Sequence, residues 1–262
     1  MMLLEGKSVI ITGAGSGVGR AASLIFARNG ARLICADVVA DRNVETVALV
    51  QGEGGTAQAV TCDVSREDQV VAAVQAAVAA YGRLDIMFNN AGIATTMQGS
   101  ATIGFADTTD ADYDRLANVN FRGTVNGCRQ AIRQFLAQGG KQGVIVNTAS
   151  VAGLIGWGGA IYGGTKGAVI QLTRSLAIEY AGQGIRVNSV CPAGMATNFG
   201  IPLEVGYRQV SDQEKEIYAN LHPLGRPIDP EDVANAAMFL ASDLAKNITG
   251  VSVPVDGGLV AG

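Results

Sequence analysis

The sequence predicts an α/β fold, a seven-stranded and mostly parallel sheet with helices on both faces. Short β-branched runs alternate with helical segments from residue 8 to residue 255, the order that builds parallel sheets. A glycine-rich turn, Gly13–Gly19, stands between the first of these runs and the helix that follows it. No repeat, linker or low-complexity tract interrupts the chain, so residues 1–262 are assigned to one doubly wound domain.

Each element has its own local signal. Buried parallel strands are expected to be short and rich in Val and Ile, and amphipathic helices to place apolar residues three or four positions apart. Pro254 indicates that the last strand lies at an edge, because proline cannot donate to a ladder. The expected strands are Ser8–Thr12, Arg32–Asp37, Ala57–Asp63, Leu84–Asn89, Gly143–Thr148, Ile185–Cys191 and Val251–Val255. The expected helices are Arg20–Asn29, Val44–Glu53, Glu67–Tyr81, Asp110–Ala137, Tyr162–Ala181 and Pro230–Ser242.

Two segments lack a regular pattern. Ile93–Thr109 is a long loop rich in Gly, Thr, Ser and Ala, and Ala193–Leu224 is less regular than its surroundings. Long loops in compact domains are usually functional or mobile. We therefore expect both segments to border a site.

Composition limits the partners of the chain. It is 48% hydrophobic and 16% charged, which is too apolar for a disordered protein. The net charge is −4 and no Lys/Arg-rich run occurs, so nucleic acid is not an expected partner. Glu5 and Lys7 interrupt the apolar start, and no apolar run approaches the roughly 20 residues of a membrane span. We expect no membrane partner and a cytoplasmic location.

Cysteine and histidine usage points the same way. The cysteines lie far apart without a Cys-x-x-Cys pair, the pattern of reduced and mostly buried thiols. His222 is the only histidine, which makes a His-rich metal site impossible. We therefore expect a site without metal. The four cysteines are Cys35, Cys62, Cys128 and Cys191.

The glycine-rich turn has the context of an anion site. A strand, a glycine turn and a helix start direct unpaired backbone N–H groups and the helix dipole at a phosphate. Asp37 ends the second expected strand, 18 positions after Gly19, close to where a dinucleotide fold places the carboxylate that binds ribose hydroxyls. The turn alone would be weak evidence. Because the turn stands between a strand and a helix, and Asp37 ends the next strand, the sequence predicts dinucleotide binding.

Tyr162 and Lys166 form the candidate reactive pair. At positions i and i+4 of a helix they share one face. A neighbouring ammonium lowers the pKa of a phenol, and Ser150, just beyond the fifth expected strand, could hydrogen-bond a substrate oxygen. Such a site can take a proton from an alcohol or give one to a ketone. Taken alone, Tyr-x-x-x-Lys is a frequent accident on amphipathic helices, so the rest of the chain decides.

With these residues placed, the chain resembles the short-chain dehydrogenase/reductase family over about residues 5–258, and the resemblance implies its Rossmann fold. The matches occur in the order that the family has. They are Thr12–Gly19 for T-G-x-x-x-G-x-G, Asp63-Val64 for the adenine-side pair, Asn89–Gly92 for N-N-A-G, Asn120 for the active-site asparagine, and Ser150, Tyr162 and Lys166 for the serine and Y-x-x-x-K.

The resemblance implies a role for each matching residue. Tyr162 would exchange a proton with the substrate, Lys166 would lower the pKa of Tyr162 and hold the nicotinamide ribose, Ser150 would bind the substrate oxygen, and Asn120 would hold a water. The cofactor half would span about residues 1–148 and the catalytic half about 149–262. The implied cofactor-binding residues are Gly13, Ser16, Gly17, Val18, Gly19, Asp37, Asp63, Val64, Asn90, Ala91, Gly92, Tyr162, Lys166, Pro192, Gly194 and Thr197.

One segment departs from the family pattern. Pro-Gly usually follows the sixth strand, whereas this chain has Pro192-Ala193-Gly194. Alanine disfavours positive φ, so the backbone path is open and Gly194 is expected to take over the flexible role.

Asp37 favours NAD over NADP, because a carboxylate accepts hydrogen bonds from free ribose hydroxyls and repels a 2′-phosphate. Members preferring NADP tend to carry a basic residue at the places that hold Ser16 and Val38 here. The expected reaction is interconversion of a secondary, hydrophobic or alicyclic alcohol and its ketone. The alternatives are a 3-oxoacyl-type ketone reductase using NADPH and a catalytically silent NAD-binding scaffold.

Residues 194–224 are interpreted as a lid over the substrate, with Trp157 as an aromatic wall. Packing against the domain or a partner subunit explains the same apolar residues equally well. The resemblance further implies a homotetramer or homodimer, paired through helices 110–137 and 160–181. The apolar lid residues are Phe199, Ile201, Pro202, Leu203, Val205, Tyr207, Ile217, Tyr218 and Leu221.

Overall fold

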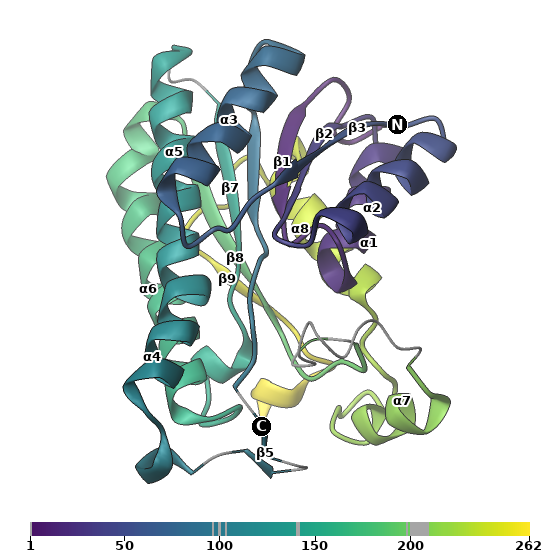
Figure 1. The fold of residues 1–262 in the computed structure, drawn as a ribbon, viewed down its shortest axis with the longest axis vertical. Coiled ribbons are helices and arrows are strands. Elements are labelled where there is room, and N and C mark those ends of the chain that lie inside the picture. Colours follow the sequence, from purple (N-terminus) through teal and green to yellow (C-terminus); the bar gives the residue numbers. More distant parts are fainter. Residues whose placement is uncertain are drawn as a thin grey trace.

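A computed structural model describes residues 2–95, 97–98, 101–102, 104–139, 142–197, 199 and 210–262 (Figure 1). Its main sheet has seven strands in the order β3-β2-β1-β4-β7-β8-β9, and every neighbouring pair is parallel. The strands are β1 Ser8–Thr12, β2 Arg32–Asp37, β3 Thr56–Thr61, β4 Ile86–Asn89, β7 Val144–Thr148, β8 Arg186–Pro192 and β9 Ser252–Val255. The predicted doubly wound α/β fold is confirmed.

The predicted strands are all present, with ends that differ by up to two residues. β4 begins at Ile86 rather than Leu84, because the backbone at Asp85 bonds across to Ser8 and Val144 before the regular ladder starts. β9 pairs with β8 alone, which places Pro254 at the sheet edge as its missing N–H demands.

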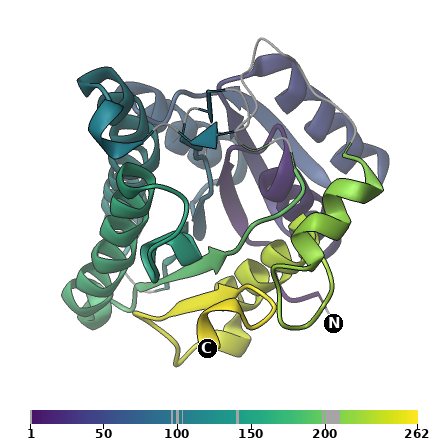
Figure 2. The same ribbon diagram turned by 90° about the horizontal axis from the view of Figure 1, so that it is seen from below.

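Helices cover both faces of the sheet. α1, α2 and α8 lie on one face, and α3, α5 and α6 on the other (Figures 1 and 2). Each face has its own buried core, and Phe26 of α1 stacks on Phe88 of β4 with ring centroids 6.0 Å apart. The helices are α1 Gly17–Arg28, α2 Ala40–Gly52, α3 Glu67–Tyr81, α4 Asp110–Leu116, α5 Gly123–Ala137, α6 Ala160–Tyr180, α7 Asp212–Ala219 and α8 Pro230–Ala241.

The region expected as one helix, residues 110–137, is divided. A π-helical turn, Ala117–Arg122, joins α4 to α5 and contains Asn120. π-turns widen the hydrogen-bond spacing by one residue and are frequent at functional sites. The turn places the Asn120 amide against the backbone of Ile93, in the loop after β4.

The two irregular segments contain elements that the sequence did not predict. Within 93–109 the strands β5 Met97–Gln98 and β6 Ala101–Thr102 pair antiparallel. Within 193–224 the helix α7 begins at a capping box of Ser211 and Glu214. Part of the expected lid, including Ile201, Leu203 and Tyr207, lies outside the described residues.

The sheet brings the strand ends to one rim. The strand order reverses between β1 and β4, the topological switch point at which open α/β sheets bind ligands. The last residues of the five strands that meet there are Thr12, Asp37, Asn89, Thr148 and Pro192.

Candidate functional site

The glycine-rich turn after β1 permits close backbone contact. Gly13 has φ +68°, and a Cβ there would lie 2.9 Å from Cα of Ala91. A Cβ on Gly19 would overlap the carbonyl oxygen of Gly13. Ser16 is the N-cap residue of α1, but its side chain makes no capping hydrogen bond. The N-terminus of α1 therefore has no side-chain cap from Ser16, and phosphate binding there stays a prediction.

Asp37 is fixed beside this turn. Its two carboxylate oxygens accept hydrogen bonds from the N–H groups of Gly15 and Val39, each at 2.8 Å. Arg42 of α2 approaches the same place, because a Cβ on Gly15 would lie 3.1 Å from Cβ of Arg42. Arg42 is a basic residue beside the turn that the sequence, judged at positions 16 and 38 alone, does not reveal.

The predicted Asn-Asn-Ala-Gly segment is held to the end of β1 by Thr12. The Thr12 hydroxyl accepts from the N–H groups of Asn90 and Ala91, at 3.0 and 3.1 Å. The Asn90 amide donates to the Thr12 carbonyl at 3.0 Å. This segment therefore closes the switch point between β1 and β4.

Asp63 and Val64 follow β3 on the same side. The Asp63 carboxylate accepts from the N–H and hydroxyl of Ser65, at 2.9 and 2.7 Å. Val64 packs against Gly123 at the start of α5, where a Cβ would lie 2.5 Å from its methyl group. Contact of both residues with the adenine side of the cofactor stays a prediction.

Gly92, Asn120 and Lys166 meet at one point. A Cβ on Gly92 would lie 3.3 Å from the Asn120 Oδ1 and 3.5 Å from the Lys166 Nζ. Asn120 is fully buried, and its amide both accepts from and donates to the backbone of Ile93, at 2.8 and 2.9 Å. The side chain of Asn120 therefore fixes the loop after β4. Its role in holding a water stays a prediction.

Lys166 is buried beneath Tyr162. Its ammonium donates to the Thr148 carbonyl at 2.8 Å and lies 5.8 Å from the centroid of the Tyr162 ring. Burial lowers the pKa of Lys166 to about 8.

Burial raises the pKa of the Tyr162 phenol to about 12, while hydrogen bonding with Ser150 lowers it. Among the described residues, burial therefore raises the Tyr162 pKa more than hydrogen bonding with Ser150 lowers it. The lowering of the Tyr162 pKa by Lys166 stays a prediction.

Ser150 is held at the end of β7. Its hydroxyl lies 3.3 Å from the Pro192 carbonyl oxygen, to which it donates, and accepts from the Ala152 N–H at 3.1 Å. Ser150, Tyr162 and Lys166 thus come together from a strand end and the first turns of α6.

The structure gives the backbone path of the Pro192-Ala193-Gly194 segment, which the sequence left open. Ala193 donates to the Val255 carbonyl at 3.1 Å, which continues the pairing of β8 with β9. Neither Ala193 nor Gly194 has a positive φ. A Cβ on Gly194 would instead lie 2.8 Å from the ring of Tyr218 and 2.9 Å from that of Trp157. Gly194 is needed for space between two rings, not for flexibility.

An aromatic side chain, that of Phe199, packs against the Tyr162 ring. Phe199 meets it edge-on, with centroids 6.2 Å apart and an interplanar angle of 61°. Thr197, expected to contact the cofactor, accepts from the Phe199 N–H at 3.1 Å. Gly158 follows Trp157, and a Cβ there would lie 3.1 Å from the Tyr162 ring. The loop that carries Trp157 therefore contacts the reactive phenol through Gly158, and the role of Trp157 as an aromatic wall stays a prediction.

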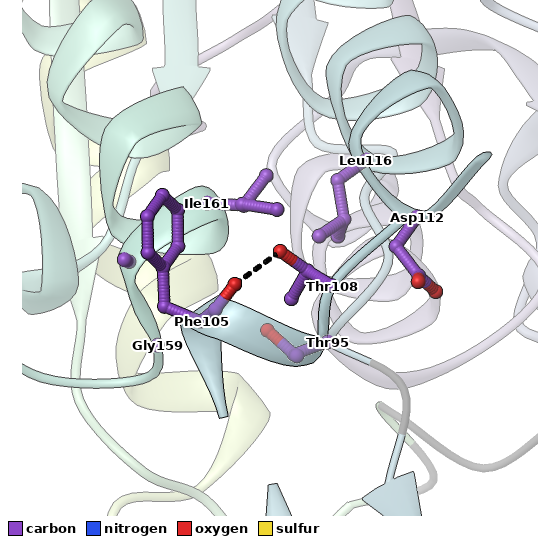
Figure 3. A pocket seen from close by; sticks show the side chains of 8 residues that line it. Thr95, Phe105, Thr108, Asp112, Leu116, Gly159 and Ile161 are labelled. Atoms are coloured by element: carbon purple, nitrogen blue, oxygen red, sulfur yellow. Dashed lines mark hydrogen bonds between the residues drawn. The ribbon is translucent and has the colours of Figure 1, made fainter. Parts of the chain in front are cut away.

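A separate small pocket lies beside the first turn of α6 (Figure 3). It encloses about 90 Å³ and its lining does not include Tyr162. The Thr108 hydroxyl donates to the Phe105 carbonyl at 2.7 Å within it. The lining residues are Thr95, Phe105, Thr108, Asp112, Leu116, Gly159, Ala160 and Ile161.

Two threonines to which the sequence assigned no role of their own hold the site. Thr12 and Thr148 contact the Asn-Asn-Ala-Gly segment, and Thr148 also receives the Lys166 ammonium through its backbone carbonyl. Both are the last residues of parallel strands, which is the signal that could have identified them.

No group of three or more His, Cys, Asp or Glu side chains could hold a metal ion within the described ranges. Nor does any helix in the described part of the chain have the length and apolar character needed to cross a membrane.

Comparison with known proteins places this site in a family. A family model described as enoyl-(acyl carrier protein) reductase matches residues 13–260. The meso-2,3-butanediol dehydrogenase of Serratia marcescens is 41% identical, over 99% of this chain and 97% of its own length. A 3-oxoacyl-(acyl-carrier-protein) reductase of Thermotoga maritima is 35% identical, over 99% of this chain and all of its own length.

The crystal structure of levodione reductase superposes with a TM-score of 0.87 at 32% identity, covering 98% of this chain and 99% of that one. Members of the family formed by these proteins are oxidoreductases that act on CH–OH groups with a nicotinamide cofactor. The chain belongs to the short-chain dehydrogenase/reductase family.

Proposed function

We propose that this protein interconverts a secondary alcohol and its ketone with NAD. One observation carries the proposal. Ser150, Tyr162 and Lys166 converge at the rim of the sheet, beside the switch point that the glycine turn borders.

The chain supplies binding and proton transfer. The Ser150 hydroxyl turns its one proton from the Pro192 carbonyl to the substrate oxygen and so orients the carbinol carbon. The Tyr162 phenolate takes the hydroxyl proton, and the Lys166 ammonium stabilises that phenolate by charge attraction. The nicotinamide, when bound, supplies the hydride acceptor. Thr148 holds Lys166 in place through its carbonyl.

Asp37 supports NAD as the cofactor. Its carboxylate is fixed by two backbone N–H groups beside the glycine turn, where it would accept hydrogen bonds from ribose hydroxyls and repel a phosphate. The runner-up is a 3-oxoacyl-type reductase using NADPH. The position of Arg42 beside the same turn favours it, as does the 3-oxoacyl reductase among the relatives.

The substrate is proposed to be hydrophobic or alicyclic. Trp157 and Phe199 leave 38% and 50% of their surfaces exposed near Tyr162, and exposed aromatic surface in a site is favourably covered by an apolar ligand. The similarity to a butanediol dehydrogenase supports a secondary alcohol.

The protein is proposed to pair through α5 and α6. A groove between these helices has apolar walls, and helices of a partner could bury its side chains. Its lining residues are Val125, Cys128, Arg129, Ile132, Arg133, Leu136, Leu172, Leu176 and Tyr180.

A reduction screen tests the proposal. Purified protein is given cyclic and open-chain secondary alcohols with NAD⁺, and the same alcohols with NADP⁺ in parallel, while absorbance of the reduced cofactor is followed. We expect turnover of at least one alcohol with NAD⁺. Turnover only of 3-oxoacyl thioesters with NADPH would support the runner-up, and cofactor binding without any turnover would support the silent scaffold.

A further inference from the structure

Three segments that are distant in the sequence meet at Gly194. Trp157 comes from the loop before α6, Gly194 follows β8, and Tyr218 belongs to α7. A Cβ on Gly194 would lie 2.9 Å from the Trp157 ring and 2.8 Å from the Tyr218 ring. Real Cβ atoms do not approach other atoms so closely. Any larger residue at 194 must therefore displace a ring.

The place where the rings meet adjoins the reacting groups. Gly194 is two residues after Pro192, whose carbonyl accepts from the Ser150 hydroxyl at 3.3 Å. On the other side, Gly158 follows Trp157 directly and abuts the Tyr162 ring. Trp157 and Gly194 therefore stand within two residues of the backbone positions that contact Tyr162 and Ser150.

These rings are incompletely covered by the protein. Trp157 is 38% exposed and Tyr218 is half-buried. Each square ångström of apolar surface removed from water contributes about 25 cal/mol. An uncharged alicyclic ring in this space would cover aromatic surface that a small open-chain alcohol leaves in water.

We propose that the rings of Trp157 and Tyr218 determine substrate specificity by selecting alicyclic over open-chain secondary alcohols. The two rings can come together because Gly194 has no side chain. This inference rests on the proposed alcohol dehydrogenase activity. It reassigns Gly194 from the cofactor to the substrate. Gly194 acts through the two rings and is a positioning residue.

The test compares two substrates in three variants. Cyclohexanol and 2-propanol are oxidised with saturating NAD⁺ by wild type, Gly194→Ala and Trp157→Ala. The matched control is Gly156→Ala, in the loop that carries Trp157, where a Cβ meets nothing within 4 Å. The readout is the ratio of kcat/KM for cyclohexanol to that for 2-propanol.

Wild type should prefer cyclohexanol. Gly194→Ala and Trp157→Ala should each lower the ratio at least about tenfold, in the range that one methylene in an apolar pocket produces. Gly156→Ala should keep the wild-type ratio. An equal loss for both alcohols would overturn the inference while leaving the proposed function intact. A wild type that oxidises neither these alcohols nor any other in the screen would remove the proposed function itself.

Fluorescence supplies a second readout, because Trp157 is the only tryptophan. In Tyr162→Phe with saturating NAD⁺, cyclohexanol should change the Trp157 emission in a saturable manner, and 2-propanol at equal concentration should change it much less. Gly194→Ala in the same background should weaken the cyclohexanol titration. An emission that does not respond to cyclohexanol, in a protein whose wild type oxidises it, would contradict contact between Trp157 and the ring.

Discussion

At the residue scale, burial of the reactive groups makes their charged forms less favourable. Lys166 carries its charge away from water with one described hydrogen bond, to the Thr148 carbonyl, and Tyr162 is partly enclosed by aromatic neighbours. Burial disfavours the charged form of both. The sequence could identify the pair from its spacing, but not the extent of its burial, which depends on how α6 packs against β7.

The lowered pKa of Lys166 predicts a specific dependence of stability on pH. Its ordinary value is 10.5 and the folded value is about 8. Below pH 8 both folded and unfolded chains hold the proton. Between these values the unfolded chain binds more protons, so stability rises with pH. The unfolding free energy of wild type minus that of Lys166→Met should increase by on the order of 1–2 kcal/mol from about pH 8 to about pH 10.

Denaturant unfolding at several pH values measures this difference. The subtraction matters because burial also raises the pKa of Cys35 to about 11 and that of Cys128 to about 12, and neither thiol is influenced by Lys166. These thiols lower the stability of both proteins alike as pH rises above their ordinary value. A difference that stays flat or falls over this range would contradict a buried ammonium at Lys166.

Asp37 predicts the cofactor preference. Asp37→Asn keeps an oxygen acceptor and removes the charge that repels a 2′-phosphate. The ratio of kcat/KM for NAD⁺ to that for NADP⁺ should fall about 10–100-fold, the usual worth of an interaction with a charged group. Arg42→Ala at the same turn should lower use of NADP⁺ and keep that of NAD⁺ within about threefold. A wild type that prefers NADP⁺, and loses it in Arg42→Ala, would reverse the assignment.

At the element scale, the regular part of the fold was accessible from the sequence. A run such as Ser8–Thr12 predicts a buried strand, because short runs of apolar β-branched residues are typical of parallel sheets. The π-turn at Asn120 could not be predicted from the sequence, because it depends on the contact of the Asn120 amide with the backbone of Ile93. The start of α7 was readable but overlooked. Ser211 and Glu214 form a capping box, a signal that weak apolar periodicity concealed.

The contact of α5 with β4 predicts a sensitive position. A Cβ on Gly127 would overlap the Asn89 Oδ1. The Asn89 amide donates to Asn147 Oδ1 at 2.9 Å, and the Asn147 amide donates to Thr173 at 3.0 Å. Gly127→Ala should therefore lower the unfolding free energy by about 1–3 kcal/mol or more, because overpacking also disturbs buried hydrogen bonds.

Thermal unfolding measures the effect, with Gly182→Ala as the control. A Cβ on Gly182 meets nothing within 4 Å, and its φ is not positive. This variant should melt within a few degrees of wild type. Equal melting temperatures for the two variants would show that α5 can move away from β4 at little cost.

At the scale of the whole molecule, the groove between α5 and α6 predicts self-association. Leu176 lines it, and an arginine there would face apolar side chains of a partner without a counter-charge. Leu176→Arg should reduce the molar mass in light scattering to that of one chain, 26.9 kDa. Val44→Arg adds the same charge on exposed α2 and should keep the wild-type mass. A wild type that is already monomeric would contradict pairing through these helices.

The central claim concerns one hydroxyl group at the rim of the sheet. Tyr162→Phe removes that oxygen and keeps the ring that meets Phe199. With NAD⁺ and the best alcohol of the screen, its kcat should fall about 10²–10⁴-fold, the contribution of a general base, while its dissociation constant for NAD⁺ stays within a few-fold of wild type. Tyr113→Phe, at an exposed position on α4, should change neither quantity. Wild-type turnover in Tyr162→Phe would contradict the account.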